Sequence, residues 1–190
     1  MSNPWLPAPS RPPDESAAPV RVIQPTGANA PQPSVTPPEA SEQLPTWSPS
    51  TPSRVWVIGT HGGAGESTLA HLLGGTATGH RWPSGPDQPV VVLTARTHAT
   101  GLRAAQLAMR AWAATETPHV RLLGLVLIAD APGRLPKPLA ELAEILRGGV
   151  PHTWQLPWVD AYRLKVDVDD VPRPVRKILA EINSLIDTTN

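Results

Sequence analysis

The chain has 190 residues, with 16 lysines and arginines balanced by 16 aspartates and glutamates, and it has no cysteine. A formal net charge of zero lacks the basic surplus of a nucleic-acid binder, so we do not expect direct nucleic-acid binding. The lack of cysteine excludes disulfides, thiol catalysis and cysteine-bound metal.

The chain begins with a proline-rich segment. Residues 1–52 hold 14 of the 25 prolines and few large apolar side chains, so this segment buries too little apolar surface to offset its conformational entropy. We therefore predict a disordered, extended arm over residues 1–53 and one compact domain over residues 54–190. The tract 7–13 and the tryptophans of the arm make it a candidate tether for a protein partner.

Predicted strands and helices alternate along the rest of the chain. Short apolar runs predict strands at 54–58, 89–94, 122–129 and 153–156, each buried on both faces. Helical spacing of apolar residues predicts helices at 66–73, 100–115, 136–147 and from 172 or 174 to about 185. Residues 76–89 are predicted to form a long surface loop. This order predicts a compact α/β sandwich of three layers, with a mainly parallel sheet of about four strands.

A glycine-rich turn joins the first predicted strand to the first predicted helix. Such turns place backbone N–H groups and a helix N-terminus around phosphates. The spacing fits the variant pattern Lys-Gly-Gly-x-Gly-Lys-[Ser/Thr]-[Ser/Thr], except that His61 and Glu66 stand in place of both lysines. The residues on its fixed positions are Gly62, Gly63, Gly65, Ser67 and Thr68.

This turn resembles the deviant phosphate loop of the ParA/MinD family of ATPases, and the likeness extends more weakly from about Arg54 to Asp187. The amino-acid sequence of the turn also resembles that of a small actinobacterial group of degenerate relatives found on plasmid-like or conjugative elements. The resemblance implies a phosphate-loop fold, ATP and Mg²⁺ as ligands, and dimers whose subunits exchange lysines. The residues that it implies around the phosphates are Gly62, Gly63, Ala64, Gly65, Glu66, Ser67 and Thr68.

Glu66 decides how much of that chemistry is expected here. Exchanging a cation for an anion beside phosphates turns an attraction into a repulsion, each on the order of 4 kcal/mol at about 4 Å. We therefore expect ATP and Mg²⁺ binding to be disfavoured and assign no catalytic residue. A carboxylate in the first helical turn gains about 0.3–1 kcal/mol from the helix dipole, so we predict that Glu66 occupies the N–H groups of its own loop. The alternative is a turn that only packs strand against helix.

Asp130 follows the third predicted strand and resembles the acidic strand end of phosphate-loop enzymes. With Ser67 it would form the magnesium site, since both lie at the carboxyl edge of a parallel sheet. The alternative is that its Asp-Ala-Pro-Gly sequence forms a turn. Arg96, Arg134 and Lys137 are candidates to restore positive charge at the same edge.

Three functions stay open at this point. The first is a pseudo-ATPase or adaptor that acts by binding a protein partner, with the arm as tether. The second is an ATPase of plasmid or mobile-element partition or transfer that binds ATP weakly, uses Ser67 and Asp130, and takes a cation from elsewhere or from the second subunit of a homodimer. The third is a purely structural protein. The longest apolar run is far below the roughly 20 residues that span a bilayer, so we expect no membrane span and a cytoplasmic location.

Overall fold

The computed structural model describes residues 24–32, 34–164 and 171–188. Its main sheet has five parallel strands in the order β3-β2-β5-β6-β7. These strands are β2 (Trp56–Gly59), β3 (Thr76–Ala77), β5 (Val90–Arg96), β6 (Arg121–Ile128) and β7 (His152–Leu156). The prediction of a mainly parallel sheet is confirmed, with five strands in place of about four.

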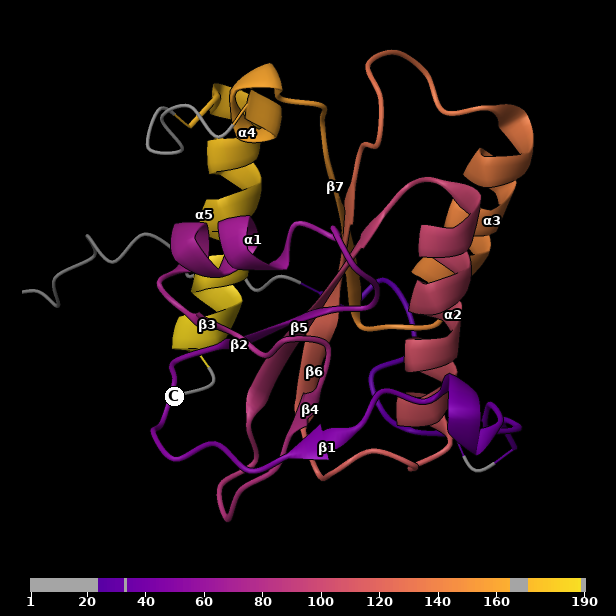
Figure 1. Cartoon of the computed structure of the whole chain (residues 1–190), viewed down its shortest axis with the longest axis vertical. Helices are drawn as coiled ribbons and strands as arrows, with labels where there is room; N and C mark the ends of the chain where they lie inside the picture. The colour runs from indigo at the N-terminus through magenta and orange to yellow at the C-terminus, as the bar shows by residue number, and fades with distance from the viewer. Residues whose placement is uncertain (1–23, 33, 165–170, 189–190) are drawn as a thin grey trace, which may run out of the picture.

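Helices cover both faces of this sheet. Figure 1 shows α1 and α5 on one face and α2 and α3 on the other, which confirms the predicted three-layer α/β architecture. The helices are α1 (Glu66–Leu73), α2 (Ala99–Ala113), α3 (Lys137–Arg147), α4 (Asp160–Leu164) and α5 (Arg173–Asp187). In the described part of the chain, no helix is long and apolar enough to cross a bilayer.

A separate hydrophobic core lies on each face of the sheet, because the central strands are apolar on both sides. Side chains of one sheet face, such as Leu93 and Leu125, pack with α2 and α3. Those of the other face, such as Val92 and Val126, pack with α1 and α5. The unalternated apolar sequence of β5 and β6 is therefore what a strand buried on both faces requires.

The strand order indicates where on this sheet a ligand site is expected. Counted along the chain the order is 2-1-3-4-5, so the connections reverse direction between β2 and β5. In doubly wound sheets, ligands bind at the carboxyl ends of the strands where this reversal occurs. The glycine loop 60–65 follows β2 and lies at that point.

The predicted surface loop over residues 76–89 is wrong. It contains β3 and also β4 (Trp82–Pro83), and the side chains of Thr78 and Trp82 are each 1% exposed. The glycines and prolines of this segment indicate turns, but its strands pair with partners far along the chain, and a local pattern does not contain that information.

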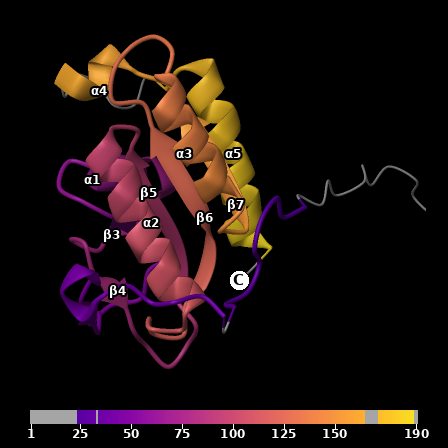
Figure 2. The ribbon, with the colours of Figure 1, turned by 90° about the vertical axis from the view of Figure 1, so that its right-hand side faces the viewer.

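The predicted disordered arm needs correction over residues 24–52, which we call the strap. The strap includes the 3₁₀ turn Ala40–Glu42 and β1 (Thr46–Trp47), which pairs in parallel with β4. Figure 2 shows it running along the domain below α2 and α3. Trp47 meets Trp56 edge to face at 5.6 Å, and the Arg81 guanidinium lies 4.6 Å from the Trp47 ring centre. A proline-rich chain loses little conformational entropy when it binds in an extended form, so a few contacts are enough to hold it. The part of the prediction on residues 1–23 lies outside the described residues.

The strap is fixed at its start by the turn between α3 and β7. The N–H groups of Thr26 and Gly27 donate to the Pro151 carbonyl at 2.8 and 3.3 Å, and that of Ala28 donates to Gly148 O at 3.0 Å. A Cβ added to Gly27 would lie 2.6 Å from Arg147 O and 2.8 Å from Gly148 O, so no side chain fits there.

A Gly27→Val variant is therefore expected to release the start of the strap. Hydrogen exchange should accelerate at least tenfold at Thr26, Gly27 and Ala28, with a loss of roughly 1–3 kcal/mol in unfolding free energy. Gly85→Val is the matched control, because a Cβ on Gly85 meets only Asp87 O at 3.7 Å. Unchanged exchange at Thr26 would contradict this anchor.

Candidate functional site

The glycine loop is held against the end of β5. Thr60 donates its N–H to Thr94 O at 3.0 Å, and the Thr94 hydroxyl donates to Ala64 O at 3.1 Å. Gly63 and Gly65 have φ values of 76° and 85°, a conformation that favours glycine. The predicted turn from strand to helix is therefore present, with its glycines where the backbone needs them.

The concave side of the loop is open. A Cβ added to Gly62 or Gly63 would meet no atom within 4 Å. The first helical bond of α1 runs from Leu69 N–H to Gly65 O, which leaves the preceding donors unused. Within the described residues, no acceptor is present for the N–H groups of Gly62, Gly63, Gly65, Glu66, Ser67 and Thr68. The loop therefore presents a row of free backbone N–H groups beside an open space.

The prediction for Glu66 is wrong, because its carboxylate turns away from the loop. Its Oε1 accepts the N–H groups of Thr78 and Gly79, both at 2.7 Å, and the Thr78 hydroxyl at 3.3 Å. Its side chain is only 10% exposed. Glu66 therefore accepts hydrogen bonds from the turn between β3 and β4, and not from the N–H groups of its own loop.

The same carboxylate joins this turn to the base of the glycine loop. Glu66 Oε2 lies 3.5 Å from His80 Nδ1, which donates to Gly59 O at 2.6 Å. A Cβ on Gly59 would lie 2.9 Å from Glu66 Oε2 and 3.0 Å from the His80 ring. His80 has a φ of 60°, which is uncommon outside glycine, so the turn 78–80 is held in shape by these contacts. Sequence reasoning missed this turn, and no spacing pattern indicates it.

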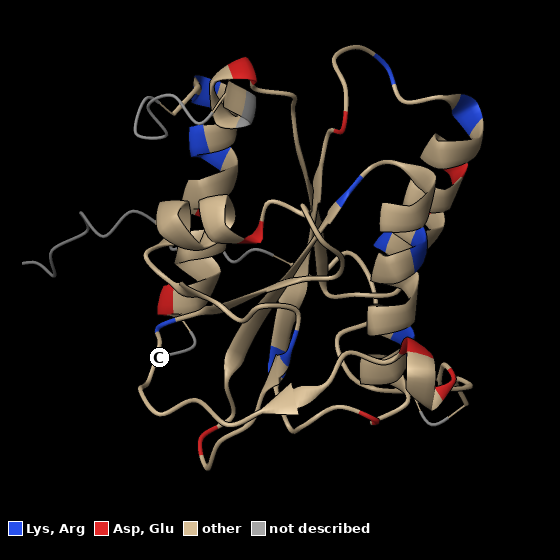
Figure 3. Cartoon of the chain, viewed as in Figure 1, with Lys and Arg blue, Asp and Glu red and all other residues tan. Residues whose placement is uncertain are grey.

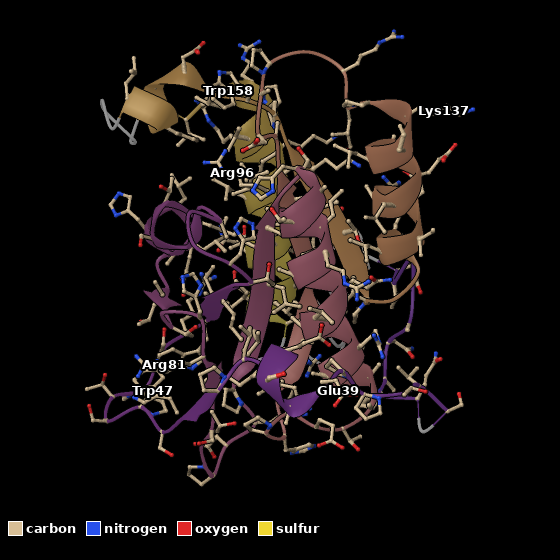
Figure 4. The ribbon with its side chains drawn as sticks, turned by 45° about the vertical axis from the view of Figure 1, so that its right-hand side comes forward. Glu39, Trp47, Arg81, Arg96, Lys137 and Trp158 are labelled. Atoms are coloured by element: carbon tan, nitrogen blue, oxygen red, sulfur yellow. The ribbon has the colours of Figure 1, made fainter. Side chains whose placement is uncertain are left out.

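Arg96, one of the three candidate cations, lies at the rim of the glycine loop. Its Nε donates to Gly63 O at 3.2 Å and its Nη1 to Ala129 O at 2.9 Å. Figure 4 shows Arg96 near the centre of the carboxyl edge, while Lys137 points outward at the start of α3. Lys137 lies 3.8 Å from Glu141, and Arg134 is exposed on the loop before α3. Only Arg96 of the three contacts the glycine loop.

His61 does not replace the missing lysine. Its Nε2 accepts the Arg96 N–H at 3.0 Å, so the proton of the neutral ring sits on Nδ1, which donates to Gly62 O at 2.9 Å. Burial lowers the pKa of His61; the Gly62 carbonyl opposes this, and the nearby His98, His80 and Arg96 lower the pKa further. The neutral ring therefore links the loop to β5 through these two hydrogen bonds.

Acidification is expected to destabilise the fold through His61 and His152. Burial also lowers the pKa of His152, although Glu181 opposes the shift. Both folded-state pKa values lie below the unfolded value of about 6.5, so the unfolded chain binds more protons as the pH falls from there. Between pH 7.5 and 5.5 we expect the melting temperature to drop by roughly 2–6 °C. His61→Gln keeps an acceptor for the Arg96 N–H and should reduce the drop. A control change at the exposed His119, to Asn, should not.

That Ser67 and Asp130 hold magnesium stays a prediction. Ser67 and Asp130 are both exposed, and among the described residues no group of three or more His, Asp or Glu side chains could hold a metal ion. The Asp130 N–H donates to the Thr97 hydroxyl at 3.1 Å, and Gly133 has a φ of 93°. These features fit the alternative prediction, a turn after β6. In Figure 3, acidic positions are coloured red both on the loop between β6 and α3 and, separately, at the start of α1.

Two cavities flank the carboxyl edge. One of about 600 Å³ lies over β6 and β7, and its lining includes Thr97, His98, Asp130, Arg134 and Gln155. The other is only about 40 Å³. It lies where α1 meets the turn after β7, and its lining includes Gly65, Thr68, Arg96, Pro157 and Trp158.

The model of a family of unknown function, DUF6668, matches residues 53–179. The chain belongs to this family. The match covers the main sheet and its loops, so the DUF6668 domain includes the whole glycine loop and ends within α5. No curated protein and no solved structure matches the chain.

Proposed function

We propose that this DUF6668 protein is a pseudo-ATPase, an adaptor that keeps the architecture of a ParA/MinD-like phosphate loop and acts by binding a protein partner. The observation that supports this most is the position of Glu66. The residue in the lysine position is 10% exposed and is bound to Thr78 and Gly79, so it is committed to structure. Phosphoryl transfer depends on cations placed on the β and γ phosphates, and the loop offers none of its own.

The surroundings of the loop support the same proposal. Arg96, the cation that contacts the loop, directs two donors at the carbonyls of Gly63 and Ala129. The space between Gly65 and the turn at Pro157 is about 40 Å³, far below the roughly 300 Å³ or more of a typical ligand pocket. A nucleotide base would need this turn to move.

A second candidate is a protein that still binds a nucleotide weakly. The free N–H groups of the loop and the open space above Gly62 favour it, since such a cradle suits an anion; these groups belong to Gly62, Gly63, Gly65, Glu66, Ser67 and Thr68. It requires Arg96 to exchange its carbonyl partners for phosphate.

Calorimetry and a phosphate-release assay on the full chain separate the two. We expect no turnover and no heat of binding with ATP, GTP or their diphosphates in Mg²⁺. Gly62→Asp places a carboxylate in the open cradle without a steric clash, and Gly85→Asp is its surface control. Micromolar binding that Gly62→Asp abolishes would favour the second candidate. Turnover by the wild-type chain would overturn the proposal.

A further inference from the structure

The two edges of the main sheet differ in how they are protected. The β3 edge is two residues long and ends at Thr78, which Glu66 binds. The β7 edge is five residues long, His-Thr-Trp-Gln-Leu, with no proline, lysine or acidic residue. Native sheets usually shorten, charge or cover their edges, because an unpaired strand recruits another. In the part of the chain that the structure describes, the β3 edge carries such protection and the β7 edge does not.

The backbone groups that β7 presents outward can be assigned. Ala129 N–H donates to Leu156 O at 2.9 Å, so Leu156 faces β6, and by alternation His152 and Trp154 do so too. The N–H and C=O groups of Thr153 and Gln155 therefore point away from the sheet. Within residues 24–32, 34–164 and 171–188, no group bonds to them from outside the sheet.

Two cavities lie near the two ends of this edge. At one end, Gln155, Pro157, Pro174 and Ile178 help line the cavity of about 600 Å³. At the other end, Pro151, His152, Leu185 and Thr188 help line a cavity of about 360 Å³. The residues from α5 recur at helical spacing, so they form one stripe beside β7, and Glu181 lies on the same stripe between Ile178 and Leu185.

We propose that the outer edge of β7 binds an extended segment of a protein partner, of the form apolar-x-basic-x-apolar. This deepens the proposed function by naming the kind of partner that the adaptor takes. The start of the strap already binds just before this strand, since the N–H groups of Thr26 and Gly27 donate to the carbonyl of Pro151, the residue that precedes β7. The added strand continues from that contact and pairs with Thr153 and Gln155.

The charge and spacing of the α5 stripe select the side chains of the partner. Glu181 is half-buried and is the charged member of the stripe, so it favours lysine or arginine opposite it. Ile178 and Leu185 lie about 4.5 and 6 Å along the helix on either side of Glu181. Residues two apart in a strand are about 6.6 Å apart, so apolar residues at these positions meet Ile178 and Leu185.

Titration of the full chain with the peptide acetyl-Thr-Val-Thr-Arg-Thr-Val-Thr-amide tests this proposal by amide NMR. We expect the Thr153 and Gln155 N–H signals to shift and their exchange to slow. Gln155→Pro removes the outward N–H at a place where edge strands tolerate proline, and it should weaken binding at least tenfold. Gln155→Ala keeps the N–H and should bind like wild type. Glu181→Gln should weaken binding about threefold to tenfold.

The outcomes are distinct from those of the nucleotide experiment, which does not involve β7. No shift with millimolar peptide, or shifts confined to the glycine loop, would overturn the proposed strand site. So would equal binding by folded Gln155→Pro and Gln155→Ala variants. A peptide with glutamate in place of arginine should bind more weakly, and equal binding would overturn the role of Glu181.

Discussion

A Glu66→Lys variant is expected to lose stability and to remain without ATPase activity, although it restores a lysine of the phosphate-loop pattern. The change removes the acceptor of Thr78 N–H and Gly79 N–H and places a cation against these donors. Hydrogen bonds to a charged group contribute about 1.5–3 kcal/mol each, so the expected cost is about 3–5 kcal/mol. For a domain of this size the melting temperature should fall by roughly 6–20 °C, which calorimetry would measure.

Two variants separate the lost contact from the change of charge. Glu66→Gln keeps an oxygen acceptor in place and should cost about 1–2 kcal/mol. Glu116→Lys makes the same charge change at an exposed position and should leave the melting temperature within about 2 °C. A Glu66→Lys protein as stable as wild type, with measurable ATP turnover, would mean that the turn 78–80 does not depend on Glu66.

The local elements were the most predictable part of the fold. The predicted helix at 66–73 coincides with α1, because Leu69 and Leu73 repeat on one face and Gly74 ends the helix with a φ of 60°. The strap and β4 were missed for a different reason. Trp47 and Trp82 are stabilised by pairing between segments about 35 residues apart, while their local sequence of prolines and serines indicates only loops.

The site was predictable where it depends on the backbone and unpredictable where it depends on side-chain direction. Gly63 and Gly65 have the positive φ values that a glycine turn implies. The direction of Glu66 depends on Thr78 and Gly79, which no spacing rule connects to it. His61 stands at the other lysine position of the pattern, and its role depends on the backbone N–H of Arg96, which it accepts at 3.0 Å.

The free N–H groups of the glycine loop and the position of Glu66 have separate structural causes. The cradle needs glycines and a helix start, and these also close the turn between β2 and α1. Glu66 serves the fold in another way, since it holds the turn 78–80 against Gly59. The fold therefore needs the glycine sequence whether or not the loop binds phosphate.

A Gly124→Ala variant is expected to be the most damaging single-methyl change in the sheet. The added Cβ would overlap the His152 carbonyl oxygen and lie 2.8 Å from Trp154 Cζ3, in the middle of the β6 to β7 pairing. Neither neighbour can yield easily, because one is backbone and the other is a ring that is 6% exposed. We expect a loss of at least about 3 kcal/mol, or insoluble protein.

Urea unfolding measures this cost, and Gly85→Ala is the matched control, since its Cβ has open space. If the Gly124→Ala protein folds, the Thr153 and Gln155 amides should also move, because β7 must shift away from β6. The proposed strand site would then lose its register, and the test peptide should bind Gly124→Ala more weakly than Gly85→Ala. A Gly124→Ala protein within about 1 kcal/mol of wild type would contradict the close approach of these two strands.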